Sequence, residues 1–220
     1  MASVGRTFKG QSAEERRAAR RRRLLDAALD LIGTEGWTAA TMTAICSHAG
    51  LTERYFYESF RDRDALYVAL IDEIADETER AVLAAIVANA EAGEEARMRA
   101  VVAALLRVLL DDPRKGRAAM LEGLGSAPLQ RRRRAILRSF EALVVERIGQ
   151  FVGSGERVPA DEVGLVAVSV VGAVDELLTR RLEGTLDVGD DRFVDHVVRM
   201  SQGIALAARA TEADRPGQGI

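Results

Sequence analysis

The segment from Thr41 to Phe60, TMTAICSHAGLTERYFYESF, decides the fold of this 220-residue chain. Ile45 and Ala49 are four positions apart, so they would share the inner face of a short helix. Gly50 follows where the chain must turn sharply, because glycine takes a positive φ without steric cost. Phe56 and Phe60 are again four apart and predict a second short helix with a buried face. A helix, a tight turn and a second helix together form the helix-turn-helix pattern.

The polar residues of this segment are placed to cap its helices and to face outward. Thr41 and Thr52 each precede a predicted helix, in the position that threonine favours as an N-cap. If the two phenylalanines face inward, Arg54, Tyr55 and Glu58 point elsewhere. A tyrosine hydroxyl is a good donor to a phosphate or a base edge. The alternative is that the aromatic residues only fill a small three-helix core.

Helical patterns continue through the rest of the chain, and strand patterns are nearly absent. Ser12 and Glu15 have the spacing of a capping box at a helix start. The helix that follows carries an apolar stripe and is expected to end at Gly33 and Gly36. Its stripe consists of Leu24, Leu25, Ala28, Leu31 and Ile32. Further helices are predicted over 62–90, Glu94–Leu110, Arg114–Leu124, Leu129–Val152, Pro159–Glu183 and Asp191–Ala208. The expected fold is therefore all-α.

Four segments follow from these patterns. We expect a flexible basic tail over 1–11, a helix-turn-helix domain over 12–62, a larger helical domain over 63–210 and a flexible tail over 211–220. No Pro/Gly/Ser linker separates the two domains, so the smaller one is expected to pack on the larger one.

Charge is distributed unevenly along the chain. Residues 1–63 hold eleven Lys/Arg against eight Asp/Glu, a net charge of +3, whereas the remaining 157 residues have a net charge of −6. A basic end on an acidic body suits a protein of which one end meets a polyanion.

Composition excludes several other classes of protein. No uncharged stretch reaches the roughly 20 residues that a transmembrane helix needs, and no secretory signal pattern is present. The single cysteine, Cys46, excludes an intrachain disulfide. His48 and His196 lack neighbours at metal-ligand spacing, so neither a metal nor a cofactor is expected. A cytoplasmic protein without membrane contact is predicted.

Residues 15–70 resemble the N-terminal domain of TetR-family transcriptional regulators. The resemblance rests on 24–32 (LLDAALDLI), 35–37 (EGW), 41–60 and 62–66 (DRDAL). It implies that Thr41 and Thr52 hold phosphates through their hydroxyls and helix N-termini, and that Tyr57 donates to a phosphate. The positions expected to face the major groove are Thr43, Glu53, Arg54 and Tyr55, with Arg54 as the best candidate for reading guanine. Arg63 would hold the DNA backbone at the edge of the site.

Two departures from the family pattern bear on recognition. Arg54-Tyr55 replaces a small Gly/Pro-Thr pair, so the recognition helix is bulkier. Glu58 is an acid where a basic or aromatic residue is frequent, and it would oppose a nearby phosphate unless it accepts from a cytosine amino group.

Arginines precede the helix-turn-helix at positions 16, 17 and 20–23, and of these Arg22 and Arg23 are the predicted DNA contacts. The alternative for each of them is a solvated helix face. The run Arg131–Arg134 points around most of a helix circumference and is interpreted as surface.

The larger domain is expected to carry dimerisation and effector binding. Between Val163 and Val174 the chain is apolar on nearly every side, so that helix needs covering on two faces. The resemblance implies a homodimer through the last two helices, and the alternative is a central helix of a monomeric bundle. The candidate interface residues are Val168, Val171, Gly172 and Val197. Candidate effector-lining residues, which would otherwise be plain core, are Met98, Met120, Leu124, Phe140 and Val144.

These observations predict a transcriptional regulator that binds double-stranded DNA at an inverted repeat and is not an enzyme. We expect a repressor released by a small apolar or amphipathic effector. The first alternative is a helical small-molecule-binding protein or enzyme whose helix-turn-helix is only structural. A second alternative is an adaptor whose aromatic helix binds a partner protein.

Overall fold

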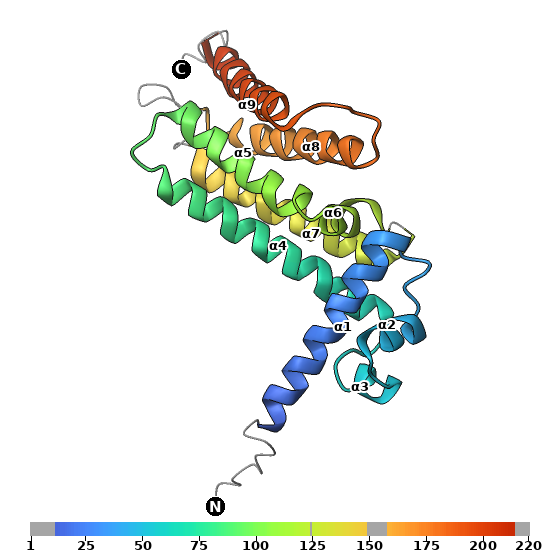
Figure 1. Ribbon diagram of the computed structural model, residues 1–220. Coiled ribbons are helices and arrows are strands. Elements are labelled where there is room, and N and C mark those ends of the chain that lie inside the picture. Colours follow the sequence, from blue (N-terminus) through green and yellow to red (C-terminus); the bar gives the residue numbers. More distant parts are fainter. Residues whose placement is uncertain (1–11, 124, 149–157, 214–220) are drawn as a thin grey trace, which may run out of the picture. The chain divides into compact units, whose positions relative to one another are not determined.

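The computed structural model describes residues 12–123, 125–148 and 158–213. All regular structure in these residues is helical, which confirms the predicted all-α fold (Figure 1). The elements are α1 (Ala13–Glu35), α2 (Met42–Ala49), α3 (Glu53–Tyr57), α4 (Arg63–Ala88), α5 (Glu94–Leu110), α6 (Pro113–Gly116), the π-helix η1 (Arg117–Leu121), α7 (Ala127–Arg147), α8 (Val163–Leu182) and α9 (Asp190–Ala213). The predicted tail over 1–11, and 214–220 of the predicted C-terminal tail, lie outside the described residues, whereas 211–213 form the last turn of α9.

The chain divides into two compact units. The first consists of Met1–Ile74 and Pro113–Arg132, and the second of Ala75–Asp112 and Arg133–Ile220. Helix α4 begins at Arg63, close to the expected domain boundary, and its first half belongs to the first unit. The functional boundary at residues 62 and 63 stays a prediction.

Helix α1 begins with the capping box that its sequence predicts. The hydroxyl of Ser12 accepts a hydrogen bond from the Glu15 amide at 3.1 Å, and the Glu15 carboxylate accepts from the Ser12 amide at 2.6 Å. The predicted apolar stripe from Leu24 to Ile32 is buried. Because this face is covered by α2, α3, α6 and η1, α1 is the central helix of the first unit.

Gly33 does not end α1, as the sequence suggested, but lies inside its last turns. A Cβ at Gly33 would be 2.4 Å from the Cβ of Arg114 and 2.6 Å from its Cα. The glycine therefore permits close approach of α6, and the helix ends at Glu35 with Gly36 as its C-cap.

The segment predicted as one helix over 114–124 consists of two elements, α6 and η1. Its π-helical turn faces α1 and is tied to α4 by Tyr67, whose hydroxyl donates to the carbonyl of Ala118 at 2.5 Å. Tyr67 is buried, and its ring stacks on Trp37 with centroids 4.8 Å apart. These contacts attach the loop between α1 and α2 to the body of the first unit.

In the second unit, α9 packs against both α5 and α8. The bounds of α5 are those predicted, but α8 begins at Val163 rather than at Pro159, because residues 160–162 form a turn ahead of it. Within this unit Arg133 of α7 donates to both carboxylate oxygens of Asp175 on α8, at 2.9 and 3.0 Å. Burial raises the pKa of Asp175, and the Arg133 guanidinium opposes that shift.

Candidate nucleic-acid interface

Helix α2 is fixed at both ends by local hydrogen bonds. Thr41 is its N-cap, and the threonine hydroxyl accepts from the Ala44 amide at 3.2 Å. At the other end Gly50 adopts the left-handed conformation, with φ 60° and ψ 40°. Arg23 of α1 donates to the carbonyls of Ala49 and Gly50, which have no partner further along a helix. The predicted tight turn is thus confirmed, and it is held against α1.

Helix α3 has only five residues and depends on its buried aromatic side for stability. Phe56 and Phe60 are buried as predicted, with ring centroids 5.9 Å apart. A helix this short is unstable in isolation, so its packing against α1 and α2 determines its orientation. Thr52 is the N-cap residue, but its hydroxyl makes no cap hydrogen bond.

The outer side of α3 presents polar and aromatic groups to solvent. The Arg54 side chain is 84% exposed, and Tyr57 is 58% exposed with its ring edge-on to Phe56. Glu53 is exposed and accepts a hydrogen bond from the Thr43 hydroxyl of α2 at 3.4 Å. Together with the exposed Thr52, these groups form one polar face that α2 and α3 share.

Arginines of α1 connect that helix to the end of α3. Arg17 donates to the backbone carbonyl of Glu58 at 2.6 Å, and Arg20 pairs with the Glu58 carboxylate at 3.1 Å. The Arg20 guanidinium also lies 4.4 Å from the ring centroid of Tyr55. Tyr55 is therefore half-buried against α1 rather than fully exposed on the polar face.

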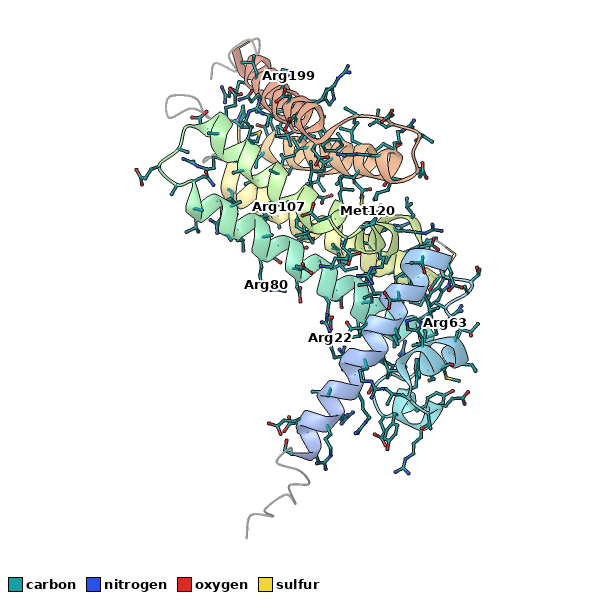
Figure 2. All side chains as sticks on the ribbon, in the orientation of Figure 1. Arg22, Arg63, Arg80, Arg107, Met120 and Arg199 are labelled. Atoms are coloured by element: carbon teal, nitrogen blue, oxygen red, sulfur yellow. The ribbon has the colours of Figure 1, made fainter. Side chains whose placement is uncertain are left out.

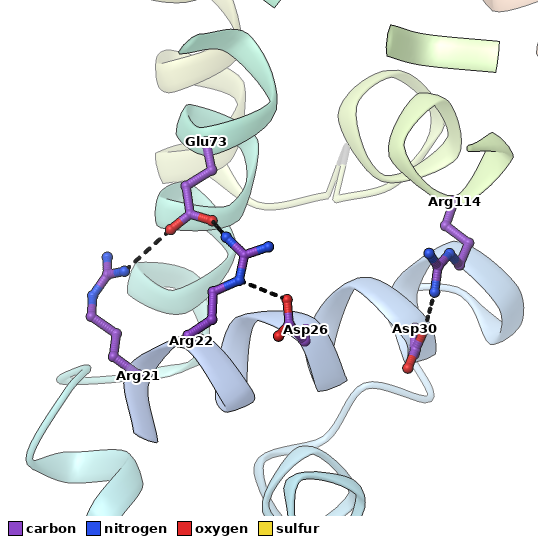
Figure 3. A network of polar contacts seen from close by, with 6 residues as sticks. All are labelled: Arg21, Arg22, Asp26, Asp30, Glu73 and Arg114. Atoms are coloured by element: carbon purple, nitrogen blue, oxygen red, sulfur yellow. Dashed lines mark hydrogen bonds and ion pairs between the residues drawn. The ribbon is translucent and has the colours of Figure 1, made fainter. Parts of the chain in front are cut away.

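The two predicted contacts in the arginine run, Arg22 and Arg23, have partners within the chain, Arg23 with carbonyls at the end of α2 and Arg22 with acids. Arg22 pairs with Asp26 at 2.9 Å and with Glu73 of α4 at 3.1 Å, and Arg21 pairs with Glu73 at 3.4 Å (Figure 3). Arg22 remains two-thirds exposed, so it can exchange these partners for a phosphate at little cost.

Arg63 lies over the indole of Trp37, 3.9 Å from the ring centroid. Its Nη1 donates to the carbonyls of Trp37 and Ala40 at 3.5 Å each. The amide of Trp37 in turn donates to the Glu122 carboxylate at 2.8 Å, which Arg117 also contacts at 3.0 Å. Arg63 thus stabilises the loop before α2, and its predicted contact with the DNA backbone would be an additional role.

A second ionic connection joins three helices at Asp30 of α1. One carboxylate oxygen pairs with Arg114 of α6, as Figure 3 shows, and the other lies 3.1 Å from Nε2 of His48 on α2. His48 is therefore a surface partner of a carboxylate. Among the described residues no group of three or more His, Cys, Asp or Glu side chains could hold a metal ion.

Every predicted DNA contact lies in the first unit, and most of these side chains are exposed. What sequence reasoning missed is the pairing of Arg20 with Glu58, which are 38 positions apart. The only signal for it was the presence of opposite charges on two elements expected to pack together.

Residues 24–70 match the model of the family described as bacterial regulatory proteins, tetR family. Over this segment the chain is similar to the TetR family. It is 34% identical over 83 residues to the HTH-type transcriptional regulator BetI of Escherichia coli strain E24377A. That match covers 38% of this chain and 43% of BetI, so the aligned segment spans less than half of this curated relative. The family is one of regulatory proteins, not of enzymes.

Solved structures with the same fold match this chain over nearly their whole length. The fatty acid degradation regulator FadR from Bacillus halodurans has a TM-score of 0.68 at 19% identity, over 83% of this chain and 97% of that one. A putative TetR-family regulator from Syntrophomonas wolfei has a TM-score of 0.71 at 16% identity, over 86% and 96%. The multidrug binding protein EbrR, complexed with imidazole, has a TM-score of 0.60 at 18% identity, over 82% and 93%. At these identities the likeness establishes the TetR fold and nothing about ligands.

The predicted effector-lining residues lie in both units. Met120 is buried in η1 of the first unit and is labelled in Figure 2. Met98 on α5 and Phe140 and Val144 on α7 are half-buried in the second unit. Leu124 lies outside the described residues. The shared lining stays a prediction.

The predicted interface residues differ in their availability. Val168 is 55% exposed and Gly172 is exposed, whereas Val171 is half-buried. Val197 is 2% exposed, so its side chain is covered within its own chain and does not belong to an outward face. Leu165 on α8 and Leu206 on α9, which the sequence analysis did not single out, are also large apolar residues that are mostly exposed. Within the described residues, none of the helices has the length and apolar character needed to cross a membrane.

Proposed function

We propose that this chain is a sequence-specific DNA-binding transcriptional regulator. The observation that carries the proposal is the exposed face of α3, where Arg54 and Tyr57 project from a helix whose other side is anchored by Phe56. An α-helix with its side chains is about 10–12 Å in diameter, and a major groove about 12 Å wide admits it. Arg54 would read a guanine, and Tyr57 and Thr52 would donate to phosphates. With genomic DNA as its target, the protein would act in the cytoplasm.

The amide groups at helix starts add to this surface. Thr41 and Thr52 stand at the N-termini of α2 and α3, where unpaired backbone amides attract phosphate. The basic charge of residues 1–63 supports the same target, because Lys and Arg near phosphates release condensed counterions. Arg22 and Arg23 would add to this effect from α1.

The regulator would act as a homodimer. Exposed apolar side chains on α8 and α9, namely Leu165, Val168 and Leu206, are costly in contact with water and are typical of an interaction surface. Gly164 and Gly172, both on α8, would let a partner helix approach closely. Two copies related by a two-fold axis would present their α3 helices to an inverted repeat with half-sites about 10 base pairs apart.

Regulation would follow from a small apolar or amphipathic effector that binds the helical body and releases DNA. Two proteins with this fold support an effector of that kind, since one is a fatty acid degradation regulator and the other a multidrug binding protein. For the effector to change DNA affinity, it must bind one conformation of the protein more tightly than the other. Repression is the simplest mode of regulation, because a bound dimer would keep the transcription machinery away from the DNA that it covers.

Selection of fragments from the source genome by the purified full-length chain, at near-physiological salt, tests this function. We expect enrichment of one short inverted repeat, and loss of that enrichment in Arg54→Ala with an unchanged circular dichroism spectrum. Binding that shows no sequence preference, with and without a panel of apolar ligands, would contradict the proposal. An enzyme or an adaptor would also lack a steep decrease of DNA affinity with salt.

A further inference from the structure

The carboxylate of Glu58, immediately after α3, lies between arginines from two helices. Its Oε2 is 3.1 Å from Nη2 of Arg20 on α1, and its Oε1 is 3.4 Å from Nε of Arg54 on α3. Its backbone carbonyl accepts from Arg17. Each carboxylate oxygen therefore already faces a guanidinium. This arrangement removes the difficulty that an acid at this position poses for DNA binding, because its charge is compensated within the chain.

The pair with Glu58 engages Arg54 through Nε, the atom nearest the side-chain stem. Among the described parts of the chain Nη1 and Nη2 of Arg54 donate no hydrogen bond, and Nε is the atom of this guanidinium nearest to the Glu58 carboxylate. Those two atoms form the fork that donates to O6 and N7 of guanine. A carboxylate on Nε and a base on the Nη fork are compatible, since arginine has five N–H donors in a fixed plane.

Glu58 is itself fixed by the larger structure and not only by its own short helix. Arg20 belongs to the 23-residue α1, and its guanidinium contacts both the Glu58 carboxylate and the ring of Tyr55. Two ion pairs thus connect α1 to Arg54, the first between Arg20 and Glu58 and the second between Glu58 and Arg54. An 84% exposed arginine without such a partner would sample many rotamers and lose that freedom on binding.

We propose that Glu58 is a positioning residue that holds Arg54 in the conformation that reads a guanine, and that Arg20 anchors Glu58. The proposal rests on the proposed DNA-binding function and specifies it further: each operator half-site contains a guanine opposite Arg54. Glu58 contributes to sequence preference through Arg54 and does not read cytosine itself.

Selection from a random-sequence library by the full-length protein and its variants tests this assignment. Arg54→Lys keeps the charge but lacks the two-pronged fork, so the guanine preference should decrease by about 5- to 150-fold at one position of each half-site. Glu58→Gln should reduce the preference at that same position by about 2- to 10-fold, the cost of ordering a long side chain. Arg20→Gln should weaken it less, because the Glu58 carboxylate is still present beside Arg54 but has lost its anchor on α1.

Glu73→Gln is the matched control. Glu73 also pairs with two arginines, Arg21 and Arg22, but it lies on α4, and both of these pairs are with α1 and not with α3. Its loss should raise affinity for all sequences to a similar extent and leave base preference unchanged. Glu58→Gln should also raise overall affinity, because it too removes a negative charge, so only the position-specific change distinguishes the two variants.

Three results would overturn the assignment. The first is a guanine preference that Arg54→Lys abolishes and Glu58→Gln leaves intact. The second is a loss of cytosine preference in Glu58→Gln at a position that Arg54→Lys does not affect, which would make Glu58 a direct reader. The third is an unchanged preference in both variants. If the wild-type protein enriches no repeat at all, the DNA-binding function fails together with the assignment. If the Glu58→Gln protein does not fold, the Arg20→Gln protein decides the question. An unchanged guanine preference in Arg20→Gln would then count against the proposal.

Discussion

Replacement of Tyr67 by phenylalanine should destabilise the protein through one hydroxyl group. Tyr67 is 1% exposed, and its hydroxyl donates to the carbonyl of Ala118 in the π-helical turn. Phenylalanine keeps the ring stacked on Trp37, so the loss is confined to one buried hydrogen bond. Removing it leaves the acceptor desolvated without that donor, at a cost of about 1–3 kcal/mol. For a chain of this size that corresponds to a decrease in Tm of about 2–12 °C.

Tyr57→Phe is the matched control for this measurement. It removes the same atom from a residue that is 58% exposed, so the Tm should change by no more than about 1–2 °C. Thermal unfolding of all three proteins at one protomer concentration gives the comparison, because a dimer's Tm depends on concentration. A Tyr67→Phe protein as stable as wild type, or an equal loss in Tyr57→Phe, would refute the account of this hydrogen bond.

The pH dependence of the same difference provides a second test. Burial, with a smaller contribution from the charge of Glu122, raises the pKa of Tyr67 above its ordinary value of about 10. The folded state therefore favours the protonated hydroxyl. Its contribution is fully present below about pH 10 and decreases as pH rises above the pKa of the unfolded chain. The gap in stability between wild type and Tyr67→Phe should thus be smaller at pH 11 than at pH 8.

Three further predictions concern other elements. Gly33→Ala should lower stability, although alanine is favoured over glycine in a helix by about 1 kcal/mol, because its Cβ would meet the backbone of Arg114 at 2.6 Å; a higher Tm would contradict this contact. Ser12→Ala should cost about 0.5–2 kcal/mol of local helix stability, visible as faster hydrogen exchange in the first turn of α1, and unchanged exchange would argue against the cap. Val168→Glu should convert the proposed dimer to a monomer in sedimentation at micromolar protein, and a persistent dimer would move the interface away from α8.

Local sequence patterns predicted the features that depend on neighbouring residues. The capping box at Ser12, the N-cap at Thr41 and the left-handed turn at Gly50 each involve residues within a few positions of one another. The buried face of α3 followed from the spacing of Phe56 and Phe60. In each case backbone geometry links spacing to structure directly, so no knowledge of the tertiary fold was needed.

Features that depend on packing between distant segments could not be predicted in the same way. Glycine is typical of a helix end, but Gly33 lies inside α1, where its missing side chain leaves room for Arg114. The partners of Arg20 and Arg22 are 38 and 51 positions away, and which acid each one meets depends on how α1 crosses the other helices. Val197 is apolar, as both core residues and interface residues are. Only the structure shows that its side chain is buried within its own chain.

The predicted DNA contacts are intermediate between these cases. Exposure of Arg54 and Tyr57 agrees with the face expected from helical periodicity. Tyr55 and Arg63 carry additional contacts with Arg20 and Trp37 that periodicity does not reveal. Their proposed roles toward DNA therefore have to be measured rather than inferred from position.

Footprinting of the wild-type protein on its selected genomic site tests the central claim most directly. Two copies that each place α3 in a major groove should protect two half-sites on one face of the duplex, with centres about 10 base pairs apart or a multiple of that spacing. Protection of the two half-sites should be lost together in Arg54→Ala. A single protected half-site, or uniform protection without a preferred site, would contradict the account.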